Sequence, residues 1–226
     1  MATSTVEDYL KAIFHEEQRS RSALVPTGRI ATAMGVAPGT VTAMMKALTD
    51  SGLVGYEPYA GVQLTPAGRS LAAHVLRRHR LVELFLVRVM GMDWSEVHEQ
   101  AEVLEHAVSD RLIERMDQML GHPAVDPHGD PIPTACGNIE EPDLPSLLSC
   151  QAGAAVRIAR VTDQRAEFLQ LLEQHGLMPG RSVVVEAHDQ LAETIGVRSD
   201  GGVPFQLGFP AASRILVESE GPESRS

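Results

Sequence analysis

Residues 26–65, PTGRIATAMGVAPGTVTAMMKALTDSGLVGYEPYAGVQLT, contain the pattern that decides the fold of the N-terminal part of the chain. A proline and a threonine open a short helix over 28–34, and a glycine ends it. A tight turn leads to a second helix over 40–51, and residues 53–65 contain two short β-like runs around a Pro/Gly turn. Helix, turn, helix and hairpin in this order predict a winged helix-turn-helix.

The second of these helices is predicted to enter the major groove of double-stranded DNA, where its N-terminal residues reach base edges. It has no Arg, Asn or Gln, so we expect readout by DNA shape, apolar contact and water. Alternatively, the same helices serve only packing or dimerisation. The candidate DNA contacts are Arg29, Ala37, Pro38, Gly39, Thr40, Thr42, Lys46 and, at the tip of the wing, Tyr59.

The charge of the chain is unevenly distributed. Taken whole, 226 residues with a net charge of −11 argue against binding nucleic acid. Residues 1–90, however, carry ten Lys and Arg against seven Asp and Glu, whereas residues 91–226 carry nine against 23. The winged-helix part is therefore mildly basic, and a local basic face can bind phosphate on an acidic protein.

The composition also bears on the cellular compartment. Two cysteines are too few for a disulfide framework, which favours a reducing compartment. No apolar run approaches the roughly 20 residues that a membrane helix needs. Residues 1–9 lack the basic and apolar segments of a signal peptide. We therefore expect a cytoplasmic protein without a membrane partner.

Beyond the winged helix, the chain is predicted to be helical up to about residue 120 and β-rich near its end. Helices are predicted over 6–17, from 65 to about 90 and from 95 to about 120. Residues 121–151 are rich in Pro, Gly and Asp and cannot sustain a helix. Strands are predicted over 156–161, 183–187, 203–207 and 214–218, with a helix over 167–176.

Acidic and imidazole side chains recur at helical spacing on the two long helices. The first helix carries His79 and Glu83, and the second carries His98, Glu102, Glu105 and His106 within roughly a 100° arc. Such groups are costly when buried and unpaired, and a divalent cation would offset that cost. A solvated helix face with ordinary Glu–His pairs is the alternative. No HExxH string supports a hydrolase.

Several strings together resemble the metal-dependent repressors of the diphtheria-toxin-repressor and manganese-transport-regulator family. They are Glu7-Asp8-Tyr9-Leu10, Ala67-Gly68-Arg69, Arg78-His79-Arg80-Leu81-Val82-Glu83, the run from Val97-His98 to Glu105-His106, and Pro127-His128-Gly129-Asp130-Pro131-Ile132-Pro133. The resemblance is close up to about residue 140. Beyond it, Leu172 to Gly180 resembles more loosely the SH3-like domain that some members append.

The resemblance implies a mostly α fold with a small β part. It predicts a winged helix-turn-helix DNA-binding domain at 1–72, a helical dimerisation and metal-binding domain at 73–140, a linker at 141–152, an SH3-like β-barrel domain at 153–220 and a disordered tail at 221–226.

The resemblance also implies two metal sites. The primary ligands carried over by position are Asp8, Glu102, Glu105 and His106, and the ancillary ligands are His79, Glu83 and His98. Iron-responsive members take two further ligands from the SH3-like domain, for which Asp163 and Gln164 are the candidates here.

The predicted ligands favour Mn²⁺. The iron-sensing branch has Met and Cys where this chain has Asp8 and Glu102, and oxygen-rich sites with one imidazole suit Mn²⁺ and Fe²⁺. The manganese branch has an acidic ligand one turn after Asp8, whereas this chain has Lys11, whose ammonium has no lone pair. This departure argues against the binuclear site of that branch and favours two separate sites.

The implied function is a homodimeric, metal-activated regulator, expected to repress metal-uptake genes by binding an operator in double-stranded DNA. An Fe²⁺-responsive regulator of the same family is one alternative. Another is a winged-helix regulator that senses an organic ligand through its C-terminal domain. A metalloenzyme would need an open coordination position, a pocket and a general base, which the sequence does not indicate, so we expect no enzyme.

Overall fold

The computed structural model describes residues 3–20 and 24–219, so the predicted tail at 221–226 lies outside the described residues. The chain divides into two compact units. The first comprises Met1–His79, Leu104–Val108 and Pro133–Glu140, and the second comprises Arg80–Val103, Ser109–Ile132 and Glu141–Ser226.

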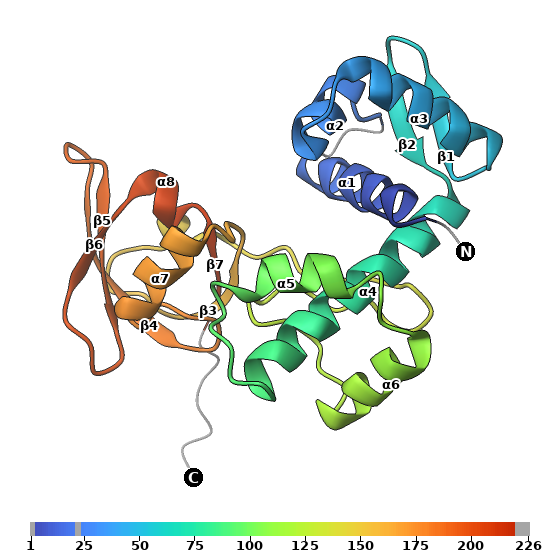
Figure 1. Ribbon diagram of the computed structural model, residues 1–226. Coiled ribbons are helices and arrows are strands. Elements are labelled where there is room, and N and C mark those ends of the chain that lie inside the picture. Colours follow the sequence, from blue (N-terminus) through green and yellow to red (C-terminus); the bar gives the residue numbers. More distant parts are fainter. Residues whose placement is uncertain (1–2, 21–23, 220–226) are drawn as a thin grey trace. The chain divides into compact units, whose positions relative to one another are not determined.

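The first unit contains the winged helix-turn-helix (Figure 1). After α1 (Ser4–Ser20), the helix-turn-helix is formed by α2 (Thr27–Met34) and α3 (Pro38–Asp50), and the antiparallel strands β1 (Val54–Glu57) and β2 (Gly61–Leu64) form the wing. The predicted fold of this region is confirmed. The helix α3 begins two residues before its predicted start, because proline is favoured in the first turn of a helix.

Apolar side chains from α1, α2 and α3 share one core. Leu10 and Ile13 of α1, Ile30 of α2, and Met45 and Leu48 of α3 are each at most 1% exposed. Full burial of such a side chain stabilises the fold by about 1.5–3 kcal/mol. The position of α1 is therefore tied to that of α3, the helix expected to read DNA.

The wing has a fixed base and an exposed tip. At the base, the amide of Val25 donates to the carbonyl oxygen of Val62 at 2.8 Å. Gly61 has a φ of +146°, and a Cβ at this position would lie 2.6 Å from the carbonyl oxygen of Val25, so a larger residue would push residue 25 away from β2. At the tip, Tyr59 is fully exposed.

The helix α4 (Pro66–Arg88) belongs to the first unit up to His79 and to the second unit from Arg80. The predicted continuous helix from 95 to about 120 is wrong, because the chain forms α5 (Val97–Leu104) and α6 (Asp110–Met119) instead. Ser109 begins α6 as its N-cap, a position that serine favours. Glu105 and His106 therefore follow α5 and do not lie on one helix face with His98.

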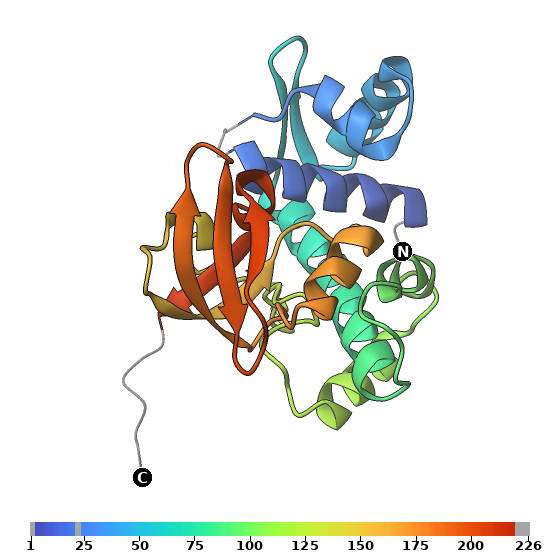
Figure 2. The ribbon, with the colours of Figure 1, turned by 90° about the vertical axis from the view of Figure 1, so that its left-hand side faces the viewer.

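The second unit ends in a five-stranded antiparallel sheet with the strand order β6-β5-β4-β3-β7 (Figure 2). The strands are β3 (Ala155–Val161), β4 (Ser182–Asp189), β5 (Thr194–Ser199), β6 (Phe205–Gly208) and β7 (Ile215–Ser219), and the helices are η1 (Leu147–Ser149), α7 (Ala166–Gln174) and α8 (Phe209–Ala212). The predicted small β-rich domain is confirmed. The prediction missed β5, whose apolar alternation is interrupted by Gly196.

This domain has its own core, which includes Ile158, Leu169, Val185 and Val197. Trp94, which precedes α5, also packs into it. None of the helices within the described ranges combines the length and the apolar character that a membrane span requires.

Candidate metal centres

Three potential metal ligands of the first unit, Asp8, Glu105 and His106, converge and are called the α1 cluster here. One ligand atom from each lies within 4.8 Å of the other two. Nε2 of His106 lies 2.9 Å from Oδ1 of Asp8 and 3.4 Å from Oε1 of Glu105. Two carboxylates and one imidazole form a donor set that suits a divalent cation such as Mn²⁺ or Fe²⁺.

The imidazole of His106 is oriented by Glu7, the neighbour of Asp8 on α1. Nδ1 of His106 donates to Oε2 of Glu7 at 2.8 Å, which leaves Nε2 on the side of Asp8. The other carboxylate oxygen of Glu7 accepts from Nη1 of Arg78 at 3.4 Å. Carboxylates that hold metal-ligating histidines in this way fix the tautomer and raise the basicity of the ligand.

Glu105 has a fully buried side chain with contacts at both carboxylate oxygens. Nζ of Lys11 donates to Oε1 at 2.7 Å, and Nδ1 of His79 donates to Oε2. These contacts reach Glu105 from α1 and α4, so they attach the segment Leu104–Val108 to the first unit. This attachment is a second reason why the predicted helix breaks after Leu104.

The negative surroundings also affect the protonation of His106. Burial alone would lower the pKa of His106, but the hydrogen bond that His106 donates to Glu7 and the charges of Glu105 and Asp8 outweigh it and raise the pKa above 6.5. The α1 cluster thus attracts positive charge, either a proton or a metal ion.

A second convergence, called the loop cluster here, lies in the second unit and comprises Glu83, Asp126 and His128. Ligand atoms of the three lie within 4.8 Å of one another, and all three residues are buried. Oε2 of Glu83 lies 3.8 Å from Nδ1 of His128. Among the described residues, neither Nδ1 of His128 nor Oδ2 of Asp126 has a hydrogen-bond partner. Buried polar atoms of this kind are costly unless something binds them.

The loop that carries Asp126 and His128 is held by hydrogen bonds and by close packing on β3. Oδ1 of Asp126 accepts from the amides of His128 at 2.8 Å and of Asp130 at 2.9 Å. A Cβ on Gly129, which has a φ of +86°, would overlap the carbonyl oxygen of Ala159, so the loop sits directly on β3. Nε2 of His128 donates to the carbonyl oxygen of Trp94, so Nδ1 is the atom that can bind a metal ion once its proton is displaced.

The two loop residues of the loop cluster, Asp126 and His128, hold protons more tightly than usual. Burial, followed by the charges of Asp130 and Glu83, raises the pKa of Asp126 to about 8. Burial lowers the pKa of His128, but the nearby carboxylates of Glu83 and Asp126 outweigh it and raise the value to about 9. Protons thus offset the charge of the loop cluster where no metal ion is bound.

The sequence did not predict Asp126 or His128 as ligands. Both lie in the Pro/Gly/Asp-rich segment interpreted as a loop or linker, although the string that contains His128 contributed to the family resemblance. The available signal was an Asp and a His two residues apart in a segment with turn-forming residues.

Of the remaining predicted ligands, His98 lies between two carboxylates of the second unit. Nδ1 of His98 lies 3.1 Å from Oε1 of Glu83, and Nε2 of His98 lies 3.7 Å from Oε1 of Glu102. Because His79 belongs to the first unit and Glu83, His98 and Glu102 belong to the second, Glu102 as a primary ligand and His79 as an ancillary ligand both stay predictions.

Asp163 and Gln164, the candidate ligands of the C-terminal domain, are engaged by other groups. Arg165 and Arg214 contact the carboxylate of Asp163, and the hydrogen bond from Arg165 above all lowers the pKa of Asp163 to about 2. The amide of Gln164 donates to Oδ2 of Asp130 at 2.8 Å. Both assignments stay predictions.

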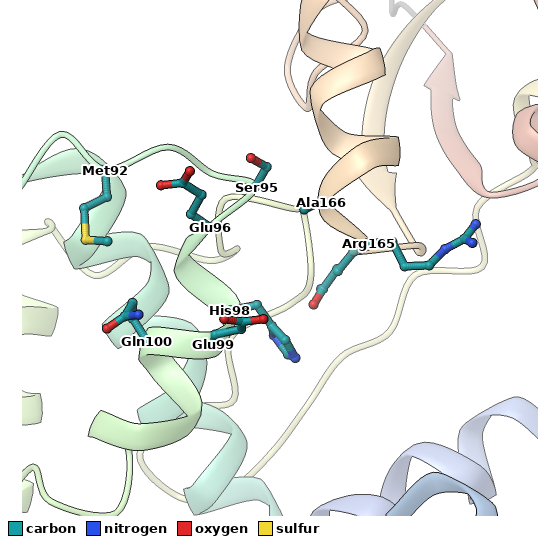
Figure 3. A pocket seen from close by; sticks show the side chains of 9 residues that line it. Met92, Ser95, Glu96, His98, Glu99, Gln100, Arg165 and Ala166 are labelled. Atoms are coloured by element: carbon teal, nitrogen blue, oxygen red, sulfur yellow. The ribbon is translucent and has the colours of Figure 1, made fainter.

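A hollow of about 700 Å³ in the second unit brings His98 and Gln164 into one lining (Figure 3). Its other lining residues are Met92, Ser95, Glu96, Glu99, Gln100, Arg165 and Ala166. In Figure 3 the guanidinium of Arg165 points away from the labelled side chains of α5. Apart from Met92 and Ala166 the lining residues are polar or charged, so the hollow gives little support to the alternative of an organic effector.

The predicted DNA contacts form the solvent-facing side of α2, α3 and the wing. Pro38, Gly39, Thr40 and Lys46 are exposed, and Thr42 is half-buried with its hydroxyl bonded to the carbonyl oxygen of Pro38 at 3.1 Å. Arg29, Ala37 and Tyr59 are exposed as well. This surface is therefore accessible to DNA, but the individual contacts stay predictions.

Comparisons with known families match successive parts of the chain. Residues 1–62 match "Iron dependent repressor, N-terminal DNA binding domain", residues 65–134 match "Iron dependent repressor, metal binding and dimerisation domain", and residues 146–219 match "FeoA domain".

Curated relatives of the chain are repressors of the same kind. The chain is 35% identical over 223 residues to the "Diphtheria toxin repressor" of Corynebacterium efficiens, and the alignment covers 95% of each chain. It is 33% identical over 196 residues to the "Iron-dependent repressor IdeR" of Mycobacterium tuberculosis, which covers 80% of this chain and 84% of the relative.

Solved structures of metal-dependent repressors also resemble the chain. A "Manganese-dependent transcriptional repressor complex with manganese" aligns with a TM-score of 0.84 at 40% identity over 95% of this chain and 99% of that one. "ScaR with bound Cd2+" aligns with a TM-score of 0.78 at 36% identity over the same shares.

A winged helix-turn-helix combined with carboxylate–imidazole clusters defines the class of metal-dependent, DNA-binding transcriptional repressors. Within that class, the chain belongs to the diphtheria toxin repressor family.

Proposed function

We propose that this protein is a Mn²⁺-responsive repressor: Mn²⁺ at the α1 cluster raises the affinity of a homodimer for its DNA operator. The observation that carries the proposal is the convergence of Asp8, Glu105 and His106. We expect the protein to act in the cytoplasm, and to control genes for metal uptake.

The chemistry of the donors supports Mn²⁺. The α1 cluster offers carboxylate oxygens and one imidazole nitrogen, and hard oxygen donors suit Mn²⁺. Neither of the free cysteines, Cys136 and Cys150, belongs to a described ligand group. The manganese-dependent repressor at 40% identity supports the same choice.

The chain offers a direct route from the α1 cluster to the reading helix. Asp8 lies on α1, whose opposite face packs into one core with α2 and α3. Glu105 and His106 lie in the segment that leads into α6. A metal ion bound by Asp8, Glu105 and His106 would hold these three side chains together. It would thus select one position of α1 and α3 relative to residues 104–108. Neutralised carboxylates would also repel DNA phosphate less.

A homodimer is supported by the match of residues 65–134 to a dimerisation domain. Large apolar side chains on α5 and α6 are exposed, among them Val103 by 71%, Leu112 by 48% and Met119 by 62%. Leu112 and Met119 lie seven residues apart and therefore on one face of α6, and exposed apolar patches mark interaction surfaces. We propose that they contribute to the dimer interface, which would set the spacing of the two reading helices on DNA.

We propose the loop cluster as a second metal site. Its support is the burial of Glu83, Asp126 and His128, together with the orientation of His128 by Trp94. A cation there would satisfy Nδ1 of His128 and Oδ2 of Asp126, and would displace the protons that those residues hold.

Fe²⁺ is the second candidate for the activating ion, and the iron-dependent relatives support it. Anaerobic DNA-binding titrations with Mn²⁺ and with Fe²⁺ separate the two. The duplex can be obtained by selection from a random pool in the presence of each ion. If Mn²⁺ leaves the DNA affinity unchanged and Fe²⁺ raises it, the proposed manganese response is wrong.

A further inference from the structure

Lys11 places a buried positive charge beside the metal ligands of the α1 cluster. It lies one helical turn after Asp8, so the two side chains lie on the same side of α1. Its ammonium donates to Oε1 of Glu105 at 2.7 Å, and its side chain is only 10% exposed. The same oxygen lies 3.4 Å from Nε2 of His106.

This ion pair is shielded from water. Because the side chain of Glu105 is fully buried, its charge is costly without a partner, and Lys11 provides a fixed one. A divalent cation bound by Asp8, Glu105 and His106 must therefore share Glu105 with the ammonium or displace the ammonium from Oε1.

The local charge balance leads to the same conclusion. The side chains around the cluster include three carboxylates, Glu7, Asp8 and Glu105, and two cations, Lys11 and Arg78. With neutral imidazoles, one divalent ion brings the sum from −1 to +1, and a second ion would bring it to +3. Two adjacent divalent ions are therefore disfavoured while Lys11 is present.

We propose that Lys11 is a built-in cation of the α1 cluster, which limits the cluster to one divalent ion and weakens the binding of that ion. The proposal rests on the proposed function, because it requires the α1 cluster to bind metal. Lys11 thereby sets the Mn²⁺ concentration at which the cluster fills, without being a ligand itself.

The test measures Mn²⁺ binding to the full-length protein from the electron paramagnetic resonance signal of free Mn²⁺. Each protein is measured with and without Asp8→Ala, so that the difference reports the α1 cluster alone. Lys11→Met should lower the dissociation constant of the cluster at least about tenfold. Lys11→Arg, which keeps the charge, should retain the wild-type constant. Lys11→Glu should add one Mn²⁺ per chain.

The outcomes separate the two proposals. If Asp8→Ala removes no Mn²⁺ binding from the wild type, the proposed function of the α1 cluster is wrong. If Asp8→Ala removes binding but Lys11→Met and Lys11→Arg bind equally, the role of Lys11 is wrong. Circular dichroism checks folding. If Lys11→Met does not fold, Lys11→Gln replaces it, because its amide can still donate to Glu105 without a charge.

Discussion

The imidazole of His128 donates a hydrogen bond to the carbonyl oxygen of Trp94, with 2.9 Å between Nε2 and the oxygen. The two rings also stack, with centroids 5.6 Å apart. Trp94 is the one tryptophan of the chain, so its fluorescence reports on the loop cluster without a label.

The first prediction is that Mn²⁺ quenches Trp94 fluorescence, because a paramagnetic ion at Nδ1 of His128 lies close to the stacked indole. Asp126→Asn keeps Oδ1 for the loop hydrogen bonds but replaces a ligand oxygen, so it should weaken the quenching at least about tenfold in Mn²⁺ concentration. Asp8→Ala is the matched control and should leave the quenching unchanged. Equal quenching curves for wild type and Asp126→Asn would rule out Asp126 as a ligand.

The second prediction concerns Glu7 as a positioning residue for His106. Glu7→Gln should weaken Mn²⁺ binding at the α1 cluster by about 10- to 100-fold, because the amide loses the charge that makes the imidazole a stronger ligand. Binding at the loop cluster, read from Trp94, should not change. Glu173→Gln, on the exposed side of α7, is the matched control. A Glu7→Gln protein with wild-type affinity would contradict this role.

The third prediction is a pH dependence of the loop cluster. Because the pKa values of Asp126 and His128 are raised to about 8 and about 9, Mn²⁺ must displace protons at neutral pH. The affinity read from Trp94 should rise from pH 6 to pH 8, by about tenfold per pH unit for each proton released. An affinity that does not change with pH would contradict the proposed ligands.

The same pKa values predict the stability of the metal-free protein. Folded His128 and Asp126 both hold protons that the unfolded chain would release, so the free energy of unfolding falls as the pH rises from about 6.5 towards 9. Thermal unfolding should therefore show a decreasing Tm over this range, and excess Mn²⁺ should reduce the decrease. A Tm that rises with pH in the metal-free protein would be inconsistent with these shifts.

The fifth prediction concerns Lys46 on the exposed side of α3. If Lys46 contacts phosphate, Lys46→Ala should weaken binding to all duplexes about equally and reduce the slope of log affinity against log salt by about 0.9. Arg198→Ala, on β5 of the C-terminal domain, is the control and should leave the slope unchanged. A change limited to some base sequences would instead indicate base contact.

The winged helix was predictable from the sequence because its signals are local. Gly35 ends α2 in the left-handed conformation, Pro38 lies in the first turn of α3, and apolar residues recur at helical spacing. Asp8 was found only through the family resemblance, because a single carboxylate on an amphipathic helix carries no signal of its own.

The features that the sequence did not reveal depend on long-range contacts. The helix break after Leu104 contains no Gly or Pro, and it coincides with the pairing of Glu105 with Lys11, 94 residues earlier. The loop cluster likewise joins Glu83 of α4 to Asp126 and His128 of an irregular segment. Helical periodicity cannot detect ligands that come from a loop.

The most direct test of the central claim is a DNA-binding titration with Mn²⁺ for the wild type and for Asp8→Ala, with a duplex selected by the Mn²⁺-loaded wild type. Asp8 is partly exposed, so its loss should leave the fold intact. We expect Mn²⁺ to raise the DNA affinity of the wild type at least about tenfold and to have little effect on Asp8→Ala. An equal Mn²⁺ response in the two proteins would contradict the assignment of the α1 cluster as the activating metal site.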